Sequence, residues 1–275
     1  SSAVTVGPTK LQVSLDPGES ATGSLFVKND ESKTQTFYPS VQKFSQNANG
    51  EKVFADDATS IAKWMHLPAS VTLEPQGEEQ VPFTMTAPAD AAPGGHFAVI
   101  WWSTSPPGNG GQVSIVTRAG ILVYVRVSGD ITEKGYIESF GANSRFAWNL
   151  PLSFVSGFKN EGNVALTPQG EIRVTNIFGI SKAVIPVNPY GGIILPGSNG
   201  NFTSAWEGEG FFFGLYKASL HVSYGESEQT ADKDWWFVMI SPLAGIIVLL
   251  VIILLFVAPP LIRKYNNWII ERAKQ

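Results

Sequence analysis

The chain contains no cysteine among its 275 residues. This absence excludes disulfide bonds, cysteine-based catalysis, thiolate metal sites and haem attachment through thioether bonds. Histidine is scarce too, because only His66, His96 and His221 occur and none has a neighbour at metal-ligand spacing. No Gly-x-Ser-x-Gly elbow, phosphate-binding loop or dinucleotide fingerprint is present. The sequence therefore predicts a protein that is not an enzyme and holds no cofactor or metal.

One acidic pair deserves a test as a calcium site. Asp56 and Asp57 lie near Asn47, Asn49 and Glu51. The spacing is not that of an EF-hand loop, and calcium takes six or more oxygen ligands. Capping of a short helix over residues 56–65 explains the two aspartates better, and a hairpin turn explains Asn49.

Charged side chains are missing from residues 235–262. Within residues 237–257, 16 of 21 positions are Val, Ile, Leu or Phe. A helix of this length extends about 31 Å, which matches a hydrocarbon core of about 30 Å. A buried core helix would show a polar face, and this stretch has none. We predict a single transmembrane helix over residues 235–262.

The flanks of this segment set its direction. Asp232 and Asp234 precede it, whereas the tail of residues 263–275 has four basic side chains and one acidic side chain. By the positive-inside rule the C-terminus is cytoplasmic and the N-terminal ectodomain is extracytoplasmic, in a plasma membrane. Export requires a signal peptide, which we expect to have been removed. The predicted membrane-interface residues are Trp235, Trp236, Arg263, Lys264, Tyr265 and Trp268.

Charge also differs between the two parts of the chain. Residues 1–234 carry a net charge of −7 and the tail carries +3. A negative ectodomain argues against binding of nucleic acid, whose backbone requires clustered Lys and Arg. The basic tail suits membrane lipid with anionic headgroups. Its apolar residues fall at helical spacing, so the tail would lie on the inner leaflet or pack on a partner.

The ectodomain has the pattern of short strands bounded by Gly, Pro and Asn. We predict an all-β fold of two tandem immunoglobulin-like β-sandwiches, residues 1–129 and 130–234, followed by the transmembrane helix. A weak internal repeat supports two related domains, because Leu73-Glu-Pro75 and Leu195-Pro196-Gly197 each precede a strand. The expected strands are 11–15, 24–28, 36–44, 70–73, 80–86, 96–102, 112–117, 120–127, 136–140, 152–159, 170–176, 181–187, 200–206 and 215–224.

Aromatic residues supply the candidate contact sites. Trp101 and Trp102 are neighbours in one strand and must point to opposite faces. One of them could stack on a sugar ring or a partner protein beside the loop at 105–111, or both could lie in the core. Phe211, Phe212 and Phe213 lie between glycines near the expected membrane-proximal end. They would form a docking patch or simply begin a strand.

Five short segments resemble one family of bacterial surface proteins. They are residues 13–20 (VSLDPGES), 23–29 (GSLFVKN), 62–65 (AKWM), 71–75 (VTLEP) and 91–96 (AAPGGH). The chain is similar here to proteins of the WxL-interacting type. The resemblance implies two immunoglobulin-like domains, a membrane helix, and binding of peptidoglycan or partner proteins. The first domain also looks distantly like pilus chaperones, without the paired basic residues that would hold a partner carboxylate.

The sequence thus predicts a single-pass cell-surface adhesion or scaffold protein. Its expected partners are membrane lipid and either another surface or membrane protein or cell-wall polymer. A first alternative is an accessory subunit of a larger membrane complex, which would dock through the helix, the membrane-proximal domain and the tail. A second is a surface hydrolase that uses two carboxylates, as glycosidases do.

Overall fold

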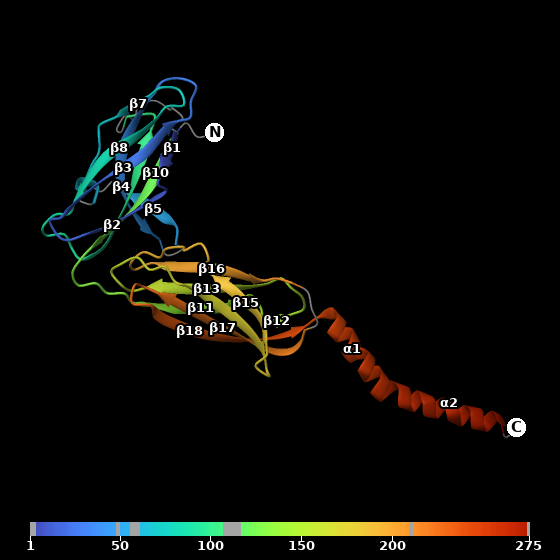
Figure 1. Cartoon of the computed structure of the whole chain (residues 1–275). Coiled ribbons are helices and arrows are strands. Elements are labelled where there is room, and N and C mark those ends of the chain that lie inside the picture. The colour runs from blue at the N-terminus through green and yellow to red at the C-terminus, as the bar shows by residue number, and fades with distance from the viewer. Residues whose placement is uncertain (1–3, 48–49, 56–60, 107–116, 209–211, 274–275) are drawn as a thin grey trace. The chain divides into compact units, whose positions relative to one another are not determined.

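The computed structural model describes the chain except for residues 1–3, 48–49, 56–60, 107–116, 209–211 and 274–275 (Figure 1). The chain divides into two compact units. The first comprises residues 1–136, 158–167 and 193–200; the second comprises residues 137–157, 168–192 and 201–275. The predicted boundary between residues 129 and 130 stays a prediction.

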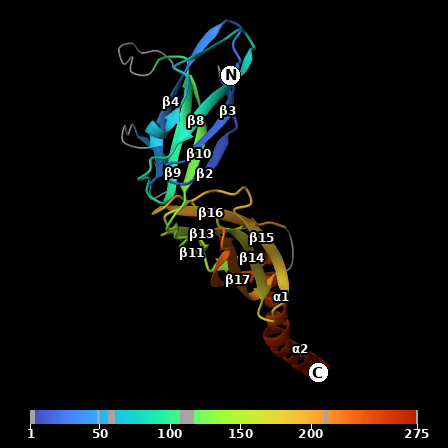
Figure 2. The ribbon, with the colours of Figure 1, turned by 60° about the vertical axis from the view of Figure 1, so that its left-hand side comes forward.

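Two sheets build the first β-sandwich. One has the order β1 (Val4–Gly7), β3 (Ser20–Asn29), β8 (Glu78–Thr86) and β6 (Met65–His66). The other has the order β2 (Lys10–Leu15), β10 (Arg118–Val127), β9 (Gly94–Ser103), β4 (Gln35–Gln46) and β5 (Lys52–Ala55), and β7 (Val71–Leu73) pairs with β4. Figure 2 shows β3 beside β8 and β9 beside β10. Alternating apolar side chains of both sheets meet in one core, which includes Leu25, Phe37, Met85, Ile100 and Trp102.

A second pair of sheets follows. The smaller one has the order β11 (Gly135–Ala142), β13 (Leu152–Asn160) and β16 (Asn199–Trp206). The larger has the order β12 (Phe146–Ala147), β18 (Gln229–Ile240), β17 (Phe213–Tyr224), β14 (Gln169–Asn176) and β15 (Ser181–Val187). Aromatic rings fill the space between these two sheets, where Phe154 of β13 packs edge-on against Phe237 of β18 at 5.8 Å between ring centroids. The all-β class predicted from the sequence is confirmed.

The C-terminal part is helical and apolar. It consists of α1 (Pro242–Ile252), the π-helical turn η2 (Ile253–Val257) and α2 (Ala258–Ala273). Pro259 and Pro260 lack the N–H that an α-helix needs, and a local π turn accommodates such a gap. Residues Pro242–Asn267 are long and apolar enough to cross a membrane.

The predicted start of this helix was wrong. Residues 235–240 belong to β18, which pairs with β17 along its whole length, and the helix begins at Pro242. Hydropathy could not separate the two elements, because a buried strand and a membrane helix are both apolar. Of the helical turn expected over residues 56–65, a 3₁₀ turn at Ile61–Trp64 is described. Asp56 and Asp57 lie outside the described residues, as do positions 112–116 of an expected strand and Asn49.

Candidate functional site

Trp101 lies on the outward face of the larger first-unit sheet. In the register of β9 with β10, Trp101 is opposite Gly120 and Trp102 is opposite Ala119. Because side chains alternate along a strand, Trp102 points into the core, where it is fully buried. Trp102 therefore offers no surface to a ligand, and its prediction as a contact residue was wrong. Trp101 is half-buried.

Contacts from four neighbours fix the Trp101 ring. A Cβ atom added to Gly120 would come within 2.7 Å of the ring, so glycine is what allows the indole to lie against β10. The guanidinium of Arg118 is 4.2 Å from the ring centroid, a cation–π distance. Phe54 of β5 packs edge-on at 5.2 Å. The indole Nε1–H donates to Gln42 Oε1 at 2.7 Å. We call this group the Trp101 platform.

The outer edge of β10 beside the platform is only partly covered. Strand β2 pairs with β10 in parallel from Leu122 to Val127. The preceding strand β1 pairs with β3 in the opposite sheet, because the chain changes sheets at Gly7–Pro8. Among the described residues, no strand pairs with the outer edge of β10 over Arg118–Ile121.

The backbone direction at this edge follows from one hydrogen bond. Leu122 N–H donates outward to Thr9 O at 3.1 Å. Backbone groups of alternate residues in a strand point to the same side. Gly120 and Arg118 therefore direct their N–H and C=O groups outward as well. This edge presents the donor and acceptor pattern that an added strand requires.

The phenylalanine cluster predicted as a docking patch is divided by the structure. Phe211 lies outside the described residues. Phe212 is half-buried and packs edge-on against Trp206 at 5.0 Å. Phe213 begins β17 and its side chain is exposed. Only Phe213 therefore presents a large apolar surface among the two described residues.

The predicted membrane-interface residues differ in position. Trp235 and Trp236 lie in β18. Trp235 stacks on Phe237 at 5.3 Å, so its ring packs on the sandwich, whereas Trp236 is exposed with Lys217 6.0 Å from its ring. Arg263, Lys264 and Tyr265 are exposed on α2. The side chain of Trp268 lies outside the described part of the chain.

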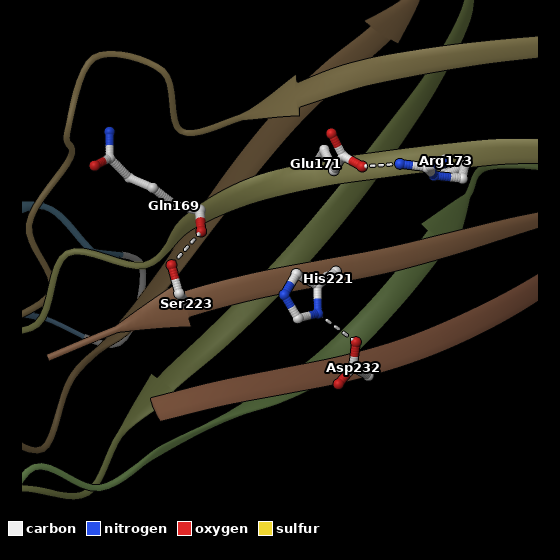
Figure 3. A network of polar contacts seen from close by, with 6 residues as sticks. All are labelled: Gln169, Glu171, Arg173, His221, Ser223 and Asp232. Atoms are coloured by element: carbon white, nitrogen blue, oxygen red, sulfur yellow. Dashed lines mark hydrogen bonds and ion pairs between the residues drawn. The ribbon is translucent and has the colours of Figure 1, made fainter. Parts of the chain in front are cut away.

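A polar cluster lies on the outer face of β14, β17 and β18 (Figure 3). His221 Nδ1 is 2.6 Å from Asp232 Oδ1, and Arg173 forms an ion pair with Glu171 at 2.7 Å. Ser223 Oγ donates to the backbone carbonyl of Gln169 at 3.4 Å. These side chains are exposed cross-strand and same-strand pairs, which contribute little individually.

The cluster lacks the geometry of a catalytic triad. Ser223 uses its hydroxyl hydrogen on a carbonyl, as Figure 3 shows, whereas a nucleophilic serine donates to a histidine. A hollow of about 200 Å³ at the base of the helix is lined by Trp148, Asn149, Leu150, Gly208, Phe212, Ser241 and Pro242, none of them a carboxylate. Within the described part of the chain, no group of three His, Asp or Glu side chains could hold a metal ion.

Comparison with known proteins gives a likeness in fold only. No family model and no curated relative match the chain. Among solved structures, a chaperone–tip adhesin complex of CFA/I fimbriae and the class 5 fimbriae chaperone CfaA each match with a TM-score of 0.45 and 13% identity. The matches cover 84% of this chain and 97% and 98% of theirs. The Salmonella enterica SafA pilin–SafB chaperone complex matches with a TM-score of 0.38 and 14% identity, covering 86% and 95%.

These comparisons contradict the function predicted from the sequence. The solved structures quoted are fimbrial chaperones and their complexes, not cell-wall-binding adhesins. The adhesion or scaffold function was therefore wrong, and neither it nor its two alternatives is retained. The chaperones in these structures are not enzymes, which agrees with the predicted non-enzymatic class at this coarse level. The resemblance to WxL-interacting proteins stays a prediction.

Proposed function

We propose that this chain is a membrane-anchored, extracytoplasmic binding protein of the chaperone type, built on two immunoglobulin-like sandwiches. Its partner is an extended segment of another exported protein, which adds as a strand to the outer edge of β10. The observation that carries the proposal is the edge over Arg118–Ile121, unpaired by any described strand and lying beside the Trp101 platform.

Strand addition would give both affinity and selectivity at this site. The outward N–H and C=O groups of Arg118 and Gly120 would form main-chain hydrogen bonds with the partner. Each such bond contributes about 0.5–1.5 kcal/mol, so main-chain bonds alone give weak binding. The Trp101 ring, fixed by Gly120 and Gln42, would supply apolar contact for alternate side chains of the added segment.

The anchoring is part of the same proposal. The span Pro242–Asn267 has 26 residues, which gives about 39 Å of helix and exceeds the core thickness of about 30 Å. Asp232 and Asp234 on the N-terminal side and Arg263 and Lys264 on the other favour an N-terminus outside and a cytoplasmic C-terminus. In this arrangement both sandwiches lie on the extracytoplasmic side of a plasma membrane, and the apolar helix contacts lipid.

Site-directed cross-linking in the native membrane tests the proposal. A photoreactive amino acid at Arg118 should capture a segment of one exported protein, and mass spectrometry should locate that segment. The same residue placed at Lys182, on the β15 edge, is the matched control. Equal capture at the two positions, or none at Arg118, would reject strand addition at β10.

Two substitutions separate the backbone from the side chain. Arg118→Pro removes an outward N–H at the first residue of a strand, where proline is tolerated. Arg118→Ala removes only the cation–π contact with Trp101. To keep position 118 and the platform free, the photoreactive residue is moved to Lys10, the exposed first residue of β2, which is opposite Leu122 next to the open edge. Capture there should fall further with Arg118→Pro than with Arg118→Ala; equal effects would mean that the backbone edge is not used.

A further inference from the structure

Large apolar side chains are exposed at one end of the second unit. Six of them, on the β14–β15 hairpin, around β12 and at the start of β17, have exposed fractions between 52% and 80%. We call this surface the apolar end; its members are Phe146, Trp148, Ile177, Phe178, Ile180 and Phe213. Such a patch on a protein surface marks a contact with a partner or a membrane.

Strand register places the apolar end where the helix begins. Asn176, the last residue of β14, is opposite Tyr216 of β17, and Tyr216 is opposite Phe237 of β18. Phe213 is opposite Ile240, and Phe146 is opposite Val238. Because β18 ends at Ile240 and the helix begins at Pro242, all these segments lie at the helix end of the sandwich.

The hairpin is fixed in a shape that exposes its apolar residues. Asn176 Oδ1 accepts hydrogen bonds from the N–H groups of Phe178 at 3.1 Å and Ile180 at 2.9 Å. Gly179 has a positive φ of 76° and donates its N–H to Asn176 O. The hydrogen bonds of the turn therefore hold Ile177, Phe178 and Ile180 outward. Their exposure follows from an ordered turn.

No linker separates this end from the helix. Ser241 is the only residue between β18 and α1, and it is buried. Its N–H donates to Phe212 O at 2.8 Å, and its hydroxyl oxygen accepts from the N–H of Ala244 as the N-cap. At about 3.3 Å per strand residue, Phe213, opposite Ile240, lies within about two residues of the helix start.

We infer that the apolar end is seated in the lipid headgroup region of the outer leaflet and holds the second sandwich against the membrane. The inference rests on the proposed membrane anchoring. Lipid fits because α1, whose Leu243 is exposed, begins at the same end of the sheet, and because aromatic residues favour the membrane–water boundary. Arg145, exposed next to Phe146, adds a positive charge suited to phosphate headgroups.

The rest of the same sheet supports this orientation. Its outer face farther from the helix carries the charged row Glu171, His221 and Asp232, which are opposite one another across three strands. Tyr190 follows β15 at the opposite end, since Val187 pairs with Gly170 and Gly170 with Val222. It is 99% exposed, so exposure of aromatic side chains by itself does not mark the membrane side.

Depth-dependent fluorescence quenching tests the inference on the full chain. Because the chain has no cysteine, Phe178→Cys, Tyr190→Cys and Leu250→Cys each create a single labelling site. Each variant is labelled with an environment-sensitive fluorophore and reconstituted into phosphatidylcholine vesicles. Spin-labelled lipids that carry the quencher near the headgroup or deep in the acyl chain are then compared.

We expect the label at Phe178 to be quenched severalfold more strongly by the shallow spin label than the label at Tyr190. The label at Leu250 should be quenched most by the deep one. Quenching at Leu250 with none at Phe178 overturns the inference and leaves the anchoring intact. No quenching at Leu250 rejects the anchoring and the inference together. If the label at Phe178 is shielded from aqueous iodide but is not quenched by the spin-labelled lipids, the membrane inference is also overturned. Protein, not lipid, would then cover the apolar end.

Discussion

Asn29 gives the sharpest test of how the first sandwich is held together. It ends β3 with its side chain fully buried. Its two Nδ2 hydrogens are shared among three backbone carbonyls, those of Lys33 at 2.9 Å, Leu73 at 3.1 Å and Glu74 at 3.0 Å. Its Oδ1 accepts from Glu31 N at 3.0 Å. One side chain therefore ties the end of β3 to the turn before β8.

The cost of Asn29→Ala can be worked from these contacts. The two N–H groups and the accepting oxygen amount to three full hydrogen bonds, which at about 0.5–1.5 kcal/mol each give a loss of about 1.5–4.5 kcal/mol. Lys33 and Glu74 are exposed, so water can reach their carbonyls and the lower half of this range applies. We expect a loss of about 2 kcal/mol, which raises the unfolded fraction of the first sandwich about 30-fold.

Hydrogen exchange on the full chain in detergent micelles measures this loss. Protection of the β3 and β8 amides should fall about 30-fold in Asn29→Ala. Thr36→Ala is the control, because it removes an exposed hydroxyl pair with Thr72 at 2.9 Å and should change stability by less than about 0.5 kcal/mol. If Asn29→Ala and Thr36→Ala have the same small effect, the reasoning from buried hydrogen bonds is refuted.

Three further predictions follow from single side chains. Gly120→Val should displace the Trp101 ring, destabilise the first unit by about 1–3 kcal/mol in denaturant titration and reduce photocapture at Arg118; unchanged capture would show that the platform is not used. Burial raises the pKa of Tyr124 above its ordinary value of 10.0. Because Tyr124 therefore ionises at a lower pH in the unfolded chain than in the folded chain, its contribution to stability is complete below pH 10.0 and is lost as the pH rises through the raised pKa. Unfolding midpoints at about pH 9 and about pH 11 should therefore differ less in Tyr124→Phe than in the parent chain, and an equal drop in both would contradict this assignment. Ser241→Ala removes the N-cap of α1 and should cost about 1 kcal/mol, seen as faster amide exchange at Ala244; unaltered exchange would mean that the cap is dispensable.

Asn160 shows that the two sandwiches reuse one device. Like Asn29 it is fully buried at the end of a strand, and its Nδ2 donates to Val164 O at 2.8 Å and Ile194 O at 2.9 Å. Its Oδ1 accepts from Gly162 N, two residues on, as that of Asn29 does from Glu31 N. The sequence repeat at Leu73 and Leu195 lies at the bonded carbonyls, because Asn29 bonds to Leu73 O and Asn160 bonds to the carbonyl of Ile194, the residue before Leu195. The repeat was visible as a pattern, but the two asparagines were not, since a buried amide is recognised only by its partners.

Local sequence was sufficient for the fold class, most strands, the apolar span and the opposite directions of Trp101 and Trp102. Each depends on short-range periodicity or on a long uncharged run, which neighbouring residues alone determine. Tertiary pairing decided the rest. Only the register of β17 with β18 showed that residues 235–240 form a strand, and only burial showed that Trp102 is the inward residue.

The apolar end is a feature that only tertiary pairing determines. Ile177 and Phe178 follow Asn176 in what reads locally as an ordinary turn, and nothing in that stretch says which end of a sandwich it occupies. Pairing of β14, β17 and β18 brings that turn to the same end as Pro242, which is more than sixty residues away in the sequence. The apolar span is thus a property of the sequence alone. The surface beside it exists only because the strands align, since contacts between distant segments are set by register and not by local composition.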